Sequence, residues 1–113
     1  MGDPRAGSVN GDDRGASTID PFVTRLYATF NEAENLLLRK HKDYGPKNIS
    51  LSPGGPLNGL RVRMWDKIAR INHLLDTGSG PSNESLRDSF IDLANYSIIA
   101  CMVIDGNWPE GDR

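Results

Sequence analysis

Apolar residues recur at intervals of three and four along three segments of this chain of 113 residues, about 20–43, 57–75 and 83–104. That spacing places the apolar side chains of each segment on one face of an α-helix. No segment alternates apolar and polar residues in the way that a half-buried strand does. The pattern therefore predicts an all-α fold, a small bundle of three main helices.

Cap and turn residues set the limits of these helices. Asp20 can cap the first helix, and Pro21 follows at a position where a missing N–H costs nothing. This helix is expected to end before Tyr44, which precedes Gly-Pro. Ser82 or Asn83 can cap the third helix, and Asp-Gly at 105–106 ends it. The ends of the first and third helices are therefore marked by cap and turn residues.

The domain organisation follows from where apolar residues are found. Residues 1–18 contain four glycines and no aromatic residue, so we expect a disordered N-terminal tail. Residues 19–108 are expected to form a single helical domain, with Trp108 folding back on the core, and 109–113 a C-terminal tail. A unit of this size has a thin core. The stretch 93–104 is apolar almost all round, which predicts a homo-oligomer.

Several classes of protein are excluded by simple features. The longest unbroken apolar run, 98–104, is far shorter than the roughly 18 residues of a membrane span. The N-terminus has no apolar signal region, so a cytoplasmic location is expected. Cys101, the single cysteine, is expected to be a buried small hydrophobe rather than a reactive thiol. His41 and His73 lack the ligand spacing of a zinc site.

Charge is distributed unevenly, although the whole chain carries only −2. Residues 39–70 hold eight basic side chains against two acidic ones, whereas residues 76–113 hold seven acidic side chains against two basic ones. A fold that packs these segments together places a basic surface beside an acidic one. No DNA-binding motif accompanies the bases, so sequence-specific nucleic-acid binding is not expected.

Acidic side chains on the third helix could hold a divalent cation. Glu84, Asp88, Asp92 and Asn95 share one stripe, because residues four apart point the same way on a helix. Mg²⁺ (or Mn²⁺) prefers such oxygen ligands together with substrate phosphates. Alternatively, acids in the first turn only complement the helix dipole. That explanation is weaker for Asp92, more than two turns into the helix.

Basic side chains on the second helix could neutralise phosphate. Arg63, Lys67 and Arg70 share one stripe beside Asp66, a further candidate metal ligand. The alternative is a solvated face, on which Asp66 forms ion pairs worth only tenths of a kcal/mol.

The connection between the first two helices has no period from Pro46 to Pro56, and connections of this kind are often functional. Together with the residues before it, it supplies a cation, an aromatic face and an amide: Lys42, Tyr44 and Asn48. A plain surface connection is the alternative.

Three blocks of sequence resemble a family found in phages and bacteria, the nucleotide-modification-associated domain of type one. The first block is the run from His41 to Asn48, which with Lys40 before it fits the family pattern K-x-x-D-Y-G followed by a nearby Asn. The others are 60–70, with Asp66, and 84–96, with Asp88 and Asp92. The resemblance covers roughly residues 40–108. That family is in turn distantly similar to the MazG-like, all-α nucleotide pyrophosphohydrolases.

The resemblance implies a MazG-like fold completed by oligomerisation, and a nucleotide ligand. It implies a Mg²⁺-dependent pyrophosphohydrolase that splits a nucleoside triphosphate, with Asp66, Asp88 and Asp92 as metal and catalytic residues. The substrate-binding residues would be the basic, aromatic and amide side chains Lys42, Tyr44, Asn48, Arg63, Lys67, Arg70 and Asn95. Bases replace most of the acids of the first metal-binding helix of those enzymes. This replacement favours a second hypothesis, a non-catalytic nucleotide-binding module, sequestering or regulatory, that uses the same basic surface.

Overall fold

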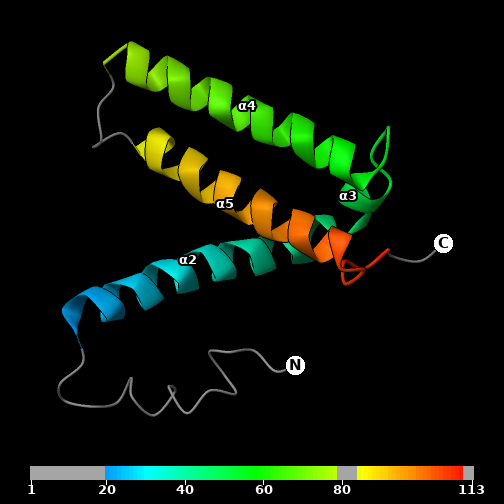
Figure 1. Ribbon diagram of the computed structural model, residues 1–113, viewed down its shortest axis with the longest axis horizontal. Coiled ribbons are helices and arrows are strands. Elements are labelled where there is room, and N and C mark those ends of the chain that lie inside the picture. Colours follow the sequence, from blue (N-terminus) through cyan, green and yellow to red (C-terminus); the bar gives the residue numbers. More distant parts are fainter. Residues whose placement is uncertain (1–19, 79–83, 111–113) are drawn as a thin grey trace. The chain divides into compact units, whose positions relative to one another are not determined.

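The computed structural model of the chain describes residues 20–78 and 84–110. Every regular element within those residues is helical, which confirms the all-α prediction (Figure 1). The helices are α2 (Pro21–Tyr44), α3 (Lys47–Ser50), α4 (Pro56–Asp76) and α5 (Glu84–Ile104). The three long ones are those expected from the sequence. In the part of the chain described, no helix is long and apolar enough to cross a membrane.

The chain divides into two compact units after Glu32. The described part of the first unit is the beginning of α2, and its cap is the predicted one: Asp20 Oδ1 accepts a hydrogen bond of 2.8 Å from the backbone N–H of Phe22. Phe22, Leu26 and Phe30 follow at helical spacing, and all three are exposed. The second unit begins at Ala33 and contains everything described below.

The end of α2 is set by Gly45. Its φ of 70° is in the left-handed region, and its N–H donates to the carbonyl of His41 over 2.8 Å, which closes the last turn. The helix includes Tyr44, one residue more than expected. The chain then forms α3, although the stretch from Pro46 to Pro56 showed no period. A single helical turn is too short to produce one.

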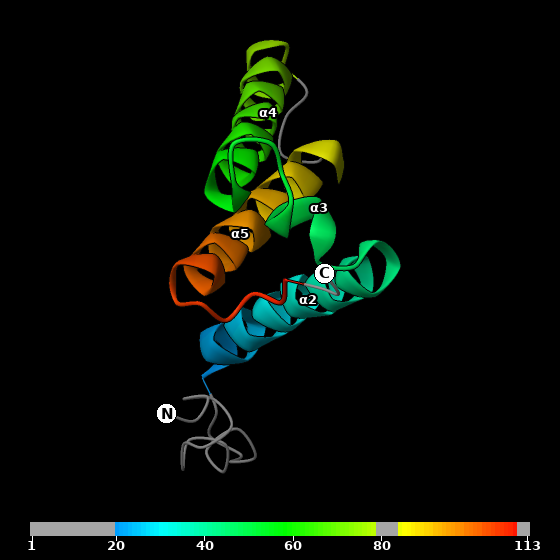
Figure 2. The same cartoon turned by 90° about the vertical axis from the view of Figure 1, so that its right-hand side faces the viewer.

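The core of the second unit lies where α4 packs along α5 (Figure 2). Ile49 of α3, Leu60 of α4 and Ile99 of α5 are its buried centre. Leu37 of α2 and Trp108 pack against this centre, which confirms the predicted return of Trp108. Residues from four helices and the segment after α5 therefore share one small core.

Three hydrogen bonds connect the ends of this unit. Asn95 Nδ2, on α5, donates to the carbonyl of Ala33 on α2 over 3.0 Å. The indole N–H of Trp108 donates to the carbonyl of Pro46 over 3.3 Å, and Ser50 Oγ donates to the carbonyl of Glu110 over 3.1 Å. The last two of these hydrogen bonds hold the segment after α5 against the residues at the two ends of α3.

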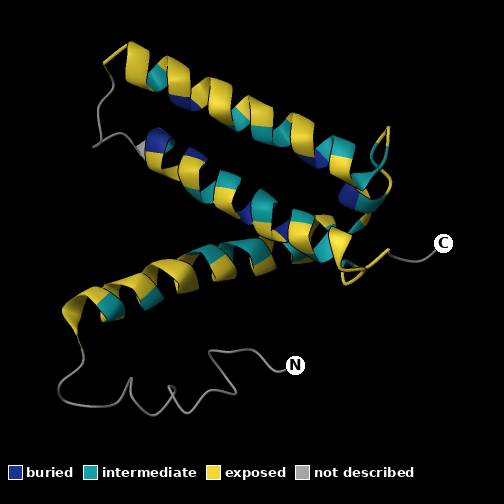
Figure 3. Cartoon of the chain, in the orientation of Figure 1, coloured by how far each residue is buried: buried dark blue, intermediate teal, exposed yellow. Residues whose placement is uncertain are grey.

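Cys101 is exposed, so the expectation that it is buried is wrong. Figure 3 shows that α5 is buried on some sides and exposed on others. Leu86 and Ile99 are among its buried residues, whereas Cys101 is exposed. An apolar sequence all round a helix does not say which side its neighbours cover.

The expected disordered tail at 1–18 lies outside the described residues, and so does most of the C-terminal tail at 109–113. The single domain at 19–108 and the homo-oligomer remain predictions at this point.

Candidate functional site

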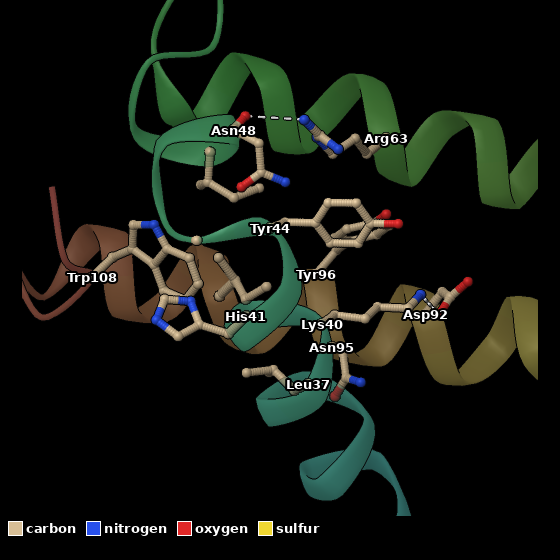
Figure 4. Close-up of a pocket in the computed structure, with 13 residues that line it drawn as sticks. Leu37, Lys40, His41, Tyr44, Asn48, Arg63, Asp92, Asn95, Tyr96 and Trp108 are labelled. Atoms are coloured by element: carbon tan, nitrogen blue, oxygen red, sulfur yellow. Dashed lines mark hydrogen bonds and ion pairs between the residues drawn. The ribbon is translucent and has the colours of Figure 1, made fainter. Parts of the chain in front are cut away.

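A cavity of about 310 Å³ opens beside the core of the second unit (Figure 4). It lies among α2, α3, α4, α5 and the segment after α5. Its lining combines charged, amide and aromatic side chains with a few apolar ones: Leu37, Lys40, His41, Tyr44, Gly45, Asn48, Ile49, Arg63, Asp92, Asn95, Tyr96, Ile99 and Trp108. This mixture, an apolar wall with a few convergent polar groups, is typical of small-molecule sites.

Asp92 is the charged centre of the cavity lining. Its Oδ1 accepts a hydrogen bond of 3.1 Å from Lys40 of α2, and its Oδ2 lies 2.9 Å from Lys67 Nζ of α4. Only 14% of the Asp92 side chain is exposed. Burial alone would raise the pKa of its carboxyl, but the hydrogen bonds and charges of Lys67 and Lys40 outweigh it and lower the pKa below its ordinary value. Asp92 is therefore an anion, held between two cations from different helices.

Arg63 extends the positive side of the cavity. Its Nη2 donates to the carbonyl of Asn48 over 3.0 Å, so α3 fixes the guanidinium against α4. Ser52 Oγ donates to the same carbonyl over 2.7 Å. This explains how the short helix α3 contributes to the site, because its backbone orients a basic side chain. The remaining N–H groups of a guanidinium suit a carboxylate or phosphate.

Aromatic and amide groups form the rest of the lining. His41 and Trp108 make an edge-to-face contact with ring centroids 5.0 Å apart and planes at 72°. His41 Nδ1 is buried without a hydrogen-bond partner. Asn95 is buried, whereas Tyr44 is 70% exposed and stands at the rim. The cavity thus offers hydrogen-bonding amides and planar rings beside its cations.

The structure brings together half of the residues that the sequence suggested for a site. Five of the suggested residues line the cavity: Tyr44, Asn48, Arg63, Asp92 and Asn95. Lys67 reaches it by its ion pair with Asp92. The others are exposed and do not line it: Lys42, Asp66, Arg70 and Asp88.

Asp66, Asp88 and Asp92 were expected to share one metal site. Within residues 20–78 and 84–110, no group of three or more His, Cys, Asp or Glu side chains is placed to hold a metal ion. The side chain of Glu84 lies outside what the structure describes. The described carboxylates therefore do not form a metal site of three protein ligands.

Eight of the thirteen lining residues were not among those suggested from the sequence, and four of the eight carry polar or aromatic side chains: Lys40, His41, Tyr96 and Trp108. Lys40 occupies the first position of the K-x-x-D-Y-G pattern, which was a usable signal. Trp108 was expected to pack on the core, but not to line a cavity. Nothing in the spacing of His41 or Tyr96 distinguished them from ordinary helix residues.

The fold and the cavity define a small all-helical protein with a site suited to an anionic ligand. The chain belongs to the family described as nucleotide modification associated domain 1, whose model matches residues 40–104. The match takes in α3, α4 and α5 and most of the cavity lining. Neither the curated proteins nor the solved structures include a significant match to this chain.

Proposed function

We propose that the cavity binds a single nucleotide and that Lys40 and Lys67 hold its phosphates. The observation that carries this proposal is the convergence of these two lysines, from α2 and α4, on one carboxylate in the cavity lining. Two cations already held around one anion need little reorganisation to accept phosphate oxygens. Membership of a family associated with nucleotide modification supports the same ligand class.

The rest of the lining suits the nucleoside. Tyr44 and Tyr96 offer rings on which a base can stack, and Asn48 offers an amide that can pair with a base edge. A volume of about 310 Å³ is at the lower limit of small-molecule sites. That size favours one mononucleotide over a segment of nucleic acid.

Binding without hydrolysis is the better supported form of this proposal. Both oxygens of Asp92 are engaged by lysines, and Asp66 and Asp88 are exposed and do not line the cavity. A sequestering or regulatory module needs only the cations, amides and rings that the cavity has.

A Mg²⁺-dependent pyrophosphohydrolase is the second candidate, and one observation favours it. Asp88 precedes Asp92 by one helical turn, and the two lie about 40° apart around α5. Mg²⁺ often binds through one or two carboxylates plus the phosphates of the substrate. A nucleotide could therefore bring its own Mg²⁺ (or Mn²⁺) to this part of α5.

One experiment separates the two forms. Ribo- and deoxynucleoside mono- and triphosphates are titrated calorimetrically into the protein in EDTA and in Mg²⁺, and products are resolved by chromatography. The module predicts binding in EDTA and intact nucleotide throughout. Metal-dependent release of pyrophosphate, lost in Asp92→Asn, would establish the hydrolase instead. No binding in either buffer would refute a nucleotide site.

A further inference from the structure

The charged and the aromatic side chains of the cavity lie at different ends of it. Figure 4 shows Lys40 and Asp92 at one end of the lining and the rings of His41 and Trp108 at the other. A ligand that fits this arrangement has one anionic end and one uncharged, planar part. A nucleotide placed in this way brings all of its phosphates to the charged end. The charge that this end can neutralise therefore limits how many phosphates the ligand has.

The charged groups around the cavity leave a net charge of +2. The charged side chains of the described lining are Lys40, Arg63 and Asp92, and Lys67 reaches the cavity through its ion pair with Asp92. These are three cations and one anion, with histidine counted as neutral at pH 7. A phosphate monoester carries a charge of about −2 at pH 7. One phosphate therefore balances the site, whereas each further phosphoryl group brings negative charge that no remaining cation of the described lining offsets.

Asp92 opposes a second phosphate directly. Its carboxylate oxygens lie 3.1 Å from Lys40 Nζ and 2.9 Å from Lys67 Nζ. A phosphate oxygen that accepts a hydrogen bond of about 2.8 Å from either Nζ therefore lies within about 6 Å of the carboxylate. Only 14% of the Asp92 side chain is exposed, so water screens the repulsion poorly. A dianion is still attracted by three cations, but every added charge is repelled by the same carboxylate.

The helices that carry these groups supply no further net positive charge beside them. Arg70 follows Lys67 by about one turn on α4, and Asp88 precedes Asp92 by about one turn on α5. Both are exposed, and neither lines the cavity. A phosphate chain that extended from the lysines along these helices would thus meet one charge of each sign.

We infer, on the basis of the nucleotide site proposed above, that its ligand is a nucleoside monophosphate and that Asp92 excludes di- and triphosphates. The lysines attract the phosphate, and the carboxylate between them limits the negative charge that they accept. A like charge placed where the wrong ligand must approach is a general means of specificity. This ligand differs from the triphosphate that the family resemblance implies.

Calorimetry on the full chain tests the ligand class. Ribo- and deoxynucleoside mono-, di- and triphosphates of each common base are titrated in EDTA and in Mg²⁺. The wild type is expected to bind the monophosphate at least about tenfold more tightly than the triphosphate of the same base in both buffers. Equal or tighter binding of the triphosphate in either buffer would overturn the inference and leave the nucleotide site standing. If no nucleotide bound at all, the nucleotide site itself would be refuted.

A pair of charge variants tests the part played by Asp92. Asp92→Asn removes the carboxylate between the lysines and is expected to reduce the preference for the monophosphate at least about fivefold. Asp66→Asn is the matched control, because it removes the same charge from an exposed position beside Lys67 that does not line the cavity. Its preference is expected to equal that of the wild type. An undiminished preference in folded Asp92→Asn, or an equal reduction in Asp66→Asn, would show that Asp92 does not select the ligand.

A third variant covers the case in which Asp92→Asn does not fold, as judged by circular dichroism. Asn48→Lys adds a cation at an exposed position of the lining and leaves both ion pairs of Asp92 in place. It is expected to reduce the preference for the monophosphate, because the net charge of the site rises by one. Comparing the mono- and triphosphate of one base cancels any change in contacts to the base. A preference equal to that of the wild type would contradict the matching of charge.

Discussion

Asp92 illustrates how one residue can connect sequence, fold and site. Its position more than two turns into α5, just before Leu-Ala, made it the acid that the helix dipole explained least. The structure supplies the partners, Lys40 and Lys67, which are 52 and 25 positions away in the sequence. No local pattern could reveal that pairing, because it depends on how α2 and α4 pack around α5.

The lowered pKa of Asp92 gives a pH-dependent contribution to stability. A carboxyl whose pKa is lower in the folded chain stabilises it fully above the unfolded value of about 3.9, and this contribution is lost as the pH falls through the folded value. Asp92→Asn is therefore expected to reduce the free energy of unfolding by about 1–2 kcal/mol at pH 7. The difference from wild type should shrink below about pH 4, as followed by urea denaturation at several pH values.

The exposed Asp66 provides the control for this prediction. Asp66→Asn is expected to change stability by less than about 0.5 kcal/mol at pH 7. A loss in Asp92→Asn that stayed constant down to pH 3 would show that the ion pairs do not stabilise the fold.

Gly59 shows a second constraint at the scale of single residues. Alanine in a helix interior is favoured over glycine by about 1 kcal/mol. A Cβ at position 59 would, however, lie 2.4 Å from both the Cβ and the Oγ of Ser52. Gly59→Ala is therefore expected to lower the melting temperature, with a net loss of about 1–3 kcal/mol. Adding Ser52→Gly should recover part of the lost stability. A Gly59→Ala variant that was more stable than the wild type would contradict the close approach of Ser52.

Among the elements, the three long helices could be predicted and the short one could not. The helical spacing of apolar residues and the cap and turn residues predicted the ends of α2, α4 and α5 to within about one residue. The single turn of α3 is defined by its contacts: Ile49 enters the core, and the carbonyl of Asn48 holds Arg63. Such a turn has no pattern of its own. The exposed side of α5 could not be predicted either, because it depends on which helices pack against α5.

The cap of α2 is an element-scale feature that can be tested separately. Asp20→Ala removes the acceptor for the N–H of Phe22 and is expected to destabilise the first turn by about 1 kcal/mol. Hydrogen exchange at Phe22 and its neighbours should become faster, while the buried amides of Leu60 and Ile99 stay protected. Asp20→Ser keeps a capping oxygen and should behave like the wild type. Unchanged exchange in Asp20→Ala would show that the cap contributes nothing.

At the scale of the whole molecule, the cavity gathers charged, amide and aromatic side chains from separate segments of the chain. The charge asymmetry of the sequence anticipated this mixture of charges, since the basic segment 39–70 supplies Lys40, Arg63 and Lys67, and the acidic segment supplies Asp92. The partners within the cavity could not be predicted, because they come from five separate parts of the chain.

Lys40 and Lys67 are proposed to hold the phosphates, and a nucleotide titration of charge variants tests this role. Calorimetry in EDTA compares the wild type with Lys40→Gln/Lys67→Gln and with the control Lys42→Gln, which removes an exposed lysine of α2 outside the cavity lining. If the two lysines hold the phosphates, the double variant loses at least about tenfold in affinity and the control changes little. Equal affinities in all three proteins would contradict it.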